Sequence, residues 1–123
     1  MAARRADMSD KVETVRSRSS GTIGRAVSEA RDVRLVLDSS TSPRPDALTN
    51  SEAFLAGVSS CGVTLIEAHA RDTGVPLAGM EVTIEGVRPA ADLARFASVT
   101  MRFALRGVSQ AEAEALVAAY RER

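Results

Sequence analysis

Cys61, the only cysteine among the 123 residues, is the side chain best suited to covalent chemistry. Its thiolate would be a nucleophile. It lies in an almost wholly apolar run, FLAGVSSCGVTLIEAHA (residues 54–70), that contains no Lys or Arg. Two interpretations are open: a reactive thiol, or a buried free cysteine that acts as a small hydrophobic residue. The sequence neighbours favour the second, because no cation lies within one helical turn to lower the pKa of the thiol.

Two candidate partners for this thiol lie on the same segment, and both fail on spacing. His69 follows Cys61 by eight residues, about 12 Å along a helix, which is too far for proton transfer within one chain. We interpret it as a solvated residue near a helix end. Glu52 precedes Cys61 by nine residues and falls on the other side of the helix, so it is a helix-start carboxylate or acts only indirectly.

Arginine is the dominant cation, with fifteen arginines against one lysine. Arg18 and Arg25 lie in a region of short strands, from which a side chain can reach a neighbouring helix. A guanidinium beside Cys61 would lower the pKa of the thiol and favour the thiolate. The alternative is that each is an exposed strand residue.

These residues must be positioned by short strands, a loop and a long helix. Residues 11–38 carry a short, broken alternating pattern, which predicts two or three strands in a meander. Residues 39–50 contain two prolines among small polar residues and predict the longest irregular connection, a kind of loop that is often functional or contacts a partner.

A long helix is predicted over residues 51–72. Thr49 or Asn50 caps its start, and Gly74 ends it. Residues 53–66 are apolar or small on nearly every side, so we expect this helix to be buried all round and to form the centre of the domain.

The remaining segments predict a strand pair and a second helix. Residues 80–86 and 95–107 alternate apolar and polar side chains, as half-buried strands do. Ser109 and Glu112 form a capping box that opens an amphipathic helix. The order of strands, helix, strand pair and helix indicates an α+β domain.

Composition predicts one small domain and excludes several classes of partner. With 45% hydrophobic residues the chain can bury a single core, so we expect a flexible N-terminal tail over residues 1–10 and one domain over residues 11–123. Sixteen basic residues balance sixteen acidic ones and aromatic residues make up 3%, which argues against nucleic acid and an anionic membrane surface as partners.

The single cysteine and single histidine exclude a structural zinc site and an intrachain disulfide, and we expect no metal and no cofactor. The sequence shows no secretory signal, and no segment approaches membrane-spanning length without charge. The predicted location is the cytoplasm, where a free thiol stays reduced.

Residues 49–86 resemble the central segment of the OsmC/Ohr family of thiol peroxidases. The shared features are a threonine and a carboxylate at the helix start, small residues before the cysteine, a helix-ending glycine and a Leu-x-Gly-x-x-Val strand. They correspond here to Thr49, Ser51, Glu52, Ser59, Ser60, Cys61, Gly74, Leu77, Gly79 and Val82. The resemblance extends to residues 24–38 and 105–123, nearly the whole chain.

This resemblance implies an OsmC-like fold, with antiparallel sheets around a buried central helix, in an intertwined homodimer with its active site at the subunit interface. Cys61 would attack the O–O bond of an organic hydroperoxide, giving an alcohol and a cysteine sulfenic acid. Glu52 takes the place of the family's carboxylate. The activating arginine of the Ohr branch falls at Thr22, so Arg25 or Arg18 would have to substitute for it.

The family's resolving cysteine would fall just after Arg123, so the sulfenic acid cannot close an intrachain disulfide and needs an external dithiol reductant, for instance of lipoyl type. The leading prediction is therefore a thiol-dependent peroxidase, an oxidoreductase of oxidative stress defence. The alternatives are a non-catalytic OsmC-like dimer that binds an apolar small molecule or senses oxidants through Cys61, and an inactive fragment.

Overall fold

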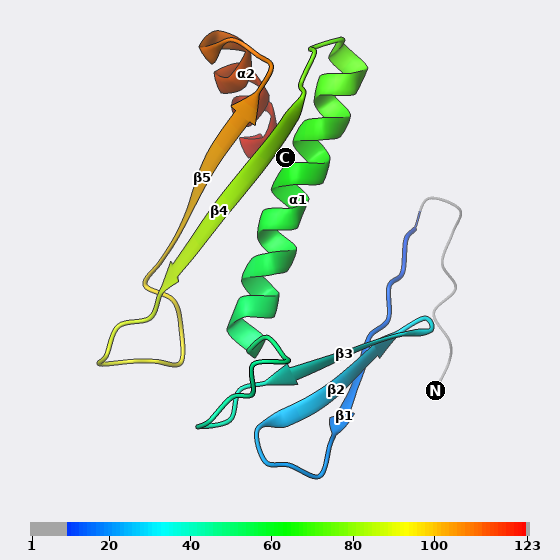
Figure 1. The fold of residues 1–123 in the computed structure, drawn as a ribbon, viewed down its shortest axis with the longest axis vertical. Coiled ribbons are helices and arrows are strands. Elements are labelled where there is room, and N and C mark those ends of the chain that lie inside the picture. The colour runs from blue at the N-terminus through cyan, green and yellow to red at the C-terminus, as the bar shows by residue number, and fades with distance from the viewer. Residues whose placement is uncertain (1–9, 123) are drawn as a thin grey trace. The chain divides into compact units, whose positions relative to one another are not determined.

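The computed structural model describes residues 10–122, which form five strands and two helices (Figure 1). The chain divides into two compact units with the boundary between Asn50 and Ser51. Each unit is described by itself. Residues 1–9 of the predicted tail lie outside the described residues, and the prediction of a single domain stays a prediction.

The N-terminal unit contains a three-stranded antiparallel sheet in the order β1-β2-β3. Its strands are β1 (Arg16–Ser19), β2 (Arg25–Ala30) and β3 (Val33–Asp38). The register pairs Arg25 with Asp38 at one end and Ala30 with Val33 at the other, where a two-residue turn joins β2 to β3. The predicted meander is confirmed.

Residues 39–49 form the loop that follows β3, as predicted. The two ends of this loop lie side by side. The backbone N–H of Asp38 donates to the carbonyl of Leu48 (2.9 Å), and the N–H of Asn50 donates to Ser39 Oγ (2.8 Å). The loop is therefore closed at its neck by hydrogen bonds to its own flanking residues.

The C-terminal unit consists of two helices and an antiparallel hairpin. Its elements are α1 (Asn50–Thr73), β4 (Gly79–Val87), β5 (Ser98–Arg106) and α2 (Gln110–Arg121). Along β4 the apolar Met80, Val82 and Ile84 are half-buried while Glu81 and Glu85 are exposed. This alternation confirms the predicted strand pair.

The core of this unit lies where α1, the hairpin and α2 meet. Ile66 and Ala70 of α1 and Leu116 of α2 are buried, and they pack against apolar residues of both strands, among them Met80 and Phe103. The α+β class and the element order are those expected from the sequence.

Helix α1 buries one stripe only. Gly62, Ile66 and Ala70, spaced four residues apart, are buried, whereas Phe54 is 58% exposed and Cys61 is exposed. The prediction of a helix buried on every side is therefore wrong for the single chain. The reason is that one hairpin and one short helix cover a single face of a 24-residue helix.

The start of α2 is the predicted capping box. Ser109 Oγ accepts from the backbone N–H of Glu112 (3.1 Å), and Glu112 Oε1 accepts from the backbone N–H of Ser109 (2.9 Å). Two of the unpaired N–H groups at the helix start are satisfied in this way.

Among the described residues, α1 alone has the length and composition of a membrane-spanning helix, with 24 residues and a mean hydropathy of 1.3 over an 18-residue window. This helix contains Glu52, Glu67, Arg71 and Asp72, so the prediction that no segment reaches membrane-spanning length without charge is not contradicted. Core helices of soluble proteins meet the same two criteria, so this observation alone carries little weight.

Candidate functional site

Cys61 lies in the middle of α1, one residue before the buried stripe begins. Gly62 faces the hairpin so closely that a Cβ there would lie 3.1 Å from Met101 Cε and 3.6 Å from Phe103 Cε1. Because consecutive helical residues point about 100° apart, the Cys61 side chain turns away from this packing. The thiol is exposed in the single chain, so it does not serve as a core residue there.

The environment of Cys61 on its own helix is neutral. Thr64 Oγ1 donates to the backbone carbonyl of Cys61 (3.4 Å). Glu52 lies in the first turn of α1, about 14 Å along the axis from Cys61, and His69 lies about 12 Å beyond it. Helix α1 therefore does not bring either residue to the thiol. The predicted solvation of His69 is only partial, because the residue is half-buried.

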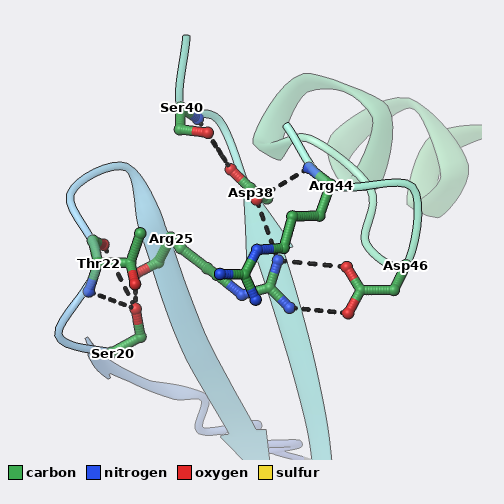
Figure 2. A network of polar contacts seen from close by, with 7 residues as sticks. All are labelled: Ser20, Thr22, Arg25, Asp38, Ser40, Arg44 and Asp46. Carbon is green, nitrogen blue, oxygen red and sulfur yellow. Dashed lines mark hydrogen bonds and ion pairs between the residues drawn. The ribbon is translucent and has the colours of Figure 1, made fainter. Parts of the chain in front are cut away.

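Arg25, the first residue of β2, lies at the centre of a polar network in the N-terminal unit (Figure 2). Its Nη1 donates to Asp38 Oδ2 (3.0 Å) and to Asp46 Oδ1 (3.3 Å), and its Nη2 donates to Asp46 Oδ2 (3.0 Å). The pair with Asp46 is thus bidentate, the arrangement that suits the planar guanidinium. The Arg25 side chain is 12% exposed.

Asp38 is buried and fully hydrogen-bonded. Besides Arg25, its carboxylate accepts from the hydroxyl of Ser40 (2.6 Å), the backbone N–H of Ser40 (3.0 Å) and the backbone N–H of Arg44 (3.1 Å). These bonds, the Ser40 hydroxyl first, hold the pKa of Asp38 far below its ordinary value. The carboxylate is therefore ionised throughout the physiological range.

The pKa values of the two other charged groups of the network, Asp46 and Arg25, are shifted by the same contacts. Hydrogen bonds from Arg25 lower the pKa of Asp46, and the two carboxylates raise the pKa of Arg25, Asp46 contributing most. Three elements therefore share one charge cluster: the start of β2, the end of β3 and the loop of residues 39–49.

Arg18, the other predicted arginine, lies on β1 and pairs with Glu29 at 3.6 Å, with its side chain 49% exposed. It matches the simple interpretation, an exposed strand residue. Of the predicted site residues, Cys61 and Glu52 share one helix, and Arg18 and Arg25 share one sheet. Within the described part of the chain no group of His, Cys, Asp and Glu side chains is arranged to hold a metal ion.

The sequence analysis missed Asp38 and Asp46 as partners of Arg25. One signal was present in principle: Arg25 and Asp38 occupy opposite positions on neighbouring antiparallel strands, where opposite charges attract. Using it requires the strand register, which the alternating pattern does not fix. Asp46 carries no such signal, because its position depends on how the loop closes.

No protein-family model matches the sequence, and no curated protein matches it significantly. Solved structures do match. An organic hydroperoxide resistance protein OsmC from Legionella pneumophila has a TM-score of 0.71 at 24% identity, covering 91% of this chain and 83% of that one. The chain has the OsmC-like fold. An OsmC-like protein from Mycoplasma pneumoniae aligns with a TM-score of 0.79 at 14% identity over 93% of this chain and 83% of that one.

OhrB of Bacillus subtilis, named an organic hydroperoxide resistance protein, has a TM-score of 0.63 at 16% identity and covers 91% of this chain and 84% of that one. The shared OsmC-like fold agrees with the family resemblance of residues 49–86 and supports it. It also accounts for the two antiparallel sheets and the two helices.

Proposed function

We propose that this chain is an OsmC/Ohr-type thiol peroxidase in which Cys61 reduces organic hydroperoxides. The observation that carries the proposal is the position of the only cysteine, exposed at the middle of the long helix of an OsmC-like fold. Two of the proteins that share this fold are named organic hydroperoxide resistance proteins. In the single chain the thiol is accessible, as the nucleophile of a peroxidase must be to its substrate.

The proposed reaction has two stages. The Cys61 thiolate attacks the distal oxygen of R–O–O–H. A sulfur–oxygen bond forms, the O–O bond breaks, and the alkoxide leaves and takes a proton to give the alcohol R–OH. The cysteine is now a sulfenic acid.

In the second stage an external dithiol attacks the sulfenic sulfur and releases water, forming a mixed disulfide. Its second thiol then displaces Cys61, which returns to the reduced state. We propose an external reductant because no second cysteine is present among these 123 residues to attack the sulfenic acid. A dihydrolipoyl compound has the two neighbouring thiols that this step needs. In total one hydroperoxide and one dithiol give an alcohol, water and a cyclic disulfide.

A homodimer is part of the proposal. Helix α1 leaves apolar residues uncovered, with Phe54 58% exposed, and a second copy of the chain is the occupant that the family resemblance implies. Light scattering should give twice the chain mass of 13.0 kDa. Sedimentation with phosphatidylcholine vesicles tests the other use of an apolar helix, and we expect the protein to stay in the supernatant, consistent with the proposed cytoplasmic location.

The activity is tested with cumene hydroperoxide and dihydrolipoamide, following peroxide consumption. We expect turnover by the native chain and none by Cys61→Ser. The matched control is the double variant Ser60→Cys with Cys61→Ser, which moves an exposed thiol by one position on the same helix. Equal peroxide consumption by the native chain and either variant would refute the proposal, because turnover would then not depend on the place of the thiol.

One observation favours a second candidate, an oxidant sensor without turnover: the Arg25 guanidinium, a predicted activator, is already engaged with two carboxylates. A sulfenic-acid trap such as dimedone separates the two. Rapid labelling of Cys61 without peroxide turnover would favour the sensor, and labelling that accompanies turnover favours the peroxidase.

A further inference from the structure

The ion pairs of Arg25 join segments that are distant in sequence. Arg25 begins β2, Asp38 ends β3, and Asp46 lies near the far end of the loop. We name these three residues the clasp. In Figure 2 the guanidinium of Arg25 lies between the carboxylates of Asp38 and Asp46.

The clasp is completed by donors from the loop itself. Asp38 accepts four hydrogen bonds, three of them from Ser40 and Arg44. A buried carboxylate is tolerated only when its oxygens are satisfied in this way. No buried side-chain nitrogen or oxygen in the described part of the chain lacks a hydrogen-bond partner.

The same loop holds the first residue of α1. Asn50 donates its backbone N–H to Ser39, the neighbour of Asp38, and the carbonyl of Leu48 accepts from the N–H of Asp38. The clasp and the start of α1 are thus connected through two short hydrogen bonds, one made by Asp38 itself and one by Ser39. The loop is thus held at its neck by these two bonds and to the sheet by the pair between Asp46 and Arg25.

The charges of this cluster cancel. The positive charges of Arg25 and Arg44 stand against the carboxylates of Asp38 and Asp46, and Arg44 also acts electrostatically on Asp46. A thiolate is stabilised by a net positive neighbour. A guanidinium that is bound to two carboxylates supplies little net charge to a third group.

We propose that Arg25 and Asp46 are positioning residues: they lock the loop of residues 39–49 and with it the start of α1, and Arg25 is not the cation that activates Cys61. This gives another role to Arg25, which was predicted from the sequence as one of two substitutes for the family's activating arginine. Only the consequence for Cys61 rests on the proposed function. The locking of the loop is a property of the N-terminal unit alone.

The test compares Arg25→Gln and Asp46→Asn with Arg34→Ala as the matched control. Arg34 pairs with Glu29 on the same sheet but is 70% exposed. Asp46 is 63% exposed, so its replacement leaves the packing in place even where Arg25→Gln fails to fold. The first readout is amide hydrogen exchange at Ser40, Arg44 and Asn50. We expect both clasp variants to speed exchange about tenfold and the control to leave it unchanged.

The second readout is the pH profile of Cys61 alkylation by iodoacetamide, which needs no peroxidase activity. If Arg25 activated the thiol, Arg25→Gln would raise the midpoint and Asp46→Asn, by freeing the guanidinium, would lower it. We expect the two variants to move the midpoint in the same direction or not at all. Opposite shifts, or unchanged exchange in Asp46→Asn, would overturn the proposal.

Discussion

Gly24 lies directly against the backbone of Ser40. A Cβ on Gly24 would come within 2.7 Å of Ser40 Cα, and Gly24 has a φ of +88°, a conformation that side chains disfavour. Its carbonyl also accepts from the N–H of Ser39 (2.8 Å). The turn before β2 therefore supports the loop after β3 at the very residue that supplies the hydroxyl for Asp38.

Gly24→Ala should lower the free energy of unfolding by about 3 kcal/mol, because the added methyl meets backbone that cannot move aside and the positive φ adds strain. Gly21→Ala is the matched control. Gly21 has a similar φ of +96° but nothing within 4 Å of its Cβ position, so it should lose only about 1 kcal/mol. Urea unfolding of both variants measures the difference. Equal losses would show that the close approach to Ser40 is relieved without cost.

The capping box of α2 predicts a second stability effect. Ser109→Ala removes the acceptor for the Glu112 N–H and should lower the free energy of unfolding by about 1 kcal/mol, whereas Ser109→Gly should cost only a few tenths. The glycine variant should lose less because water and backbone replace the missing side-chain acceptor more easily at a glycine than at an alanine. The midpoints of urea unfolding measure the change, provided that the m-value, the slope of the free energy against urea concentration, stays the same. An Ala variant as stable as the native chain would mean that the cap contributes nothing.

The low pKa of Asp38 makes stability depend on pH in acid. In the folded chain this carboxylate binds a proton more weakly than in the unfolded chain, where the pKa of an Asp side chain is about 3.9. Its contribution is therefore fully present above about pH 5 and is lost as the pH falls through 4 and below. Asp38→Asn should be less stable at pH 6 and should show a flatter decline toward pH 3.

Urea unfolding of both proteins at pH 6, 4 and 3 measures this difference. Glu81→Gln is a suitable control, because Glu81 is exposed on β4 and the charge removed is the same. An unchanged pH dependence in Asp38→Asn would contradict the hydrogen-bonded, ionised state of this carboxylate.

The element order could be predicted because its signals are local. A helix expected over residues 51–72 spans Asn50–Thr73, and the strand expected from residue 80 begins at Gly79. Capping residues, alternation and glycines act within a few residues of where they stand. The burial of α1 was mispredicted because it depends on how many other elements cover the helix, which no local pattern records.

The ion pairs of the clasp could not be predicted from the sequence. Arg25 and Asp46 are twenty-one residues apart, and their bidentate pair exists only after β2 and β3 align in register and the loop closes. The same type of residue, an arginine on a short strand, is exposed at Arg18 and almost covered at Arg25. Side-chain chemistry identified both as candidates, and tertiary placement separated them.

The distance between His69 and Cys61 along α1 gives a prediction for the proposed reaction. A general base contributes a hundredfold or more only within hydrogen-bond reach, and eight helical residues place the imidazole about 12 Å away. His69→Asn should therefore keep kcat/KM for cumene hydroperoxide within about threefold of the native value. Thermal unfolding of the variant checks that this half-buried position tolerates the change. A hundredfold loss in a folded variant would require the imidazole of a second copy to act on the thiol, and would make the subunit interface part of the chemistry.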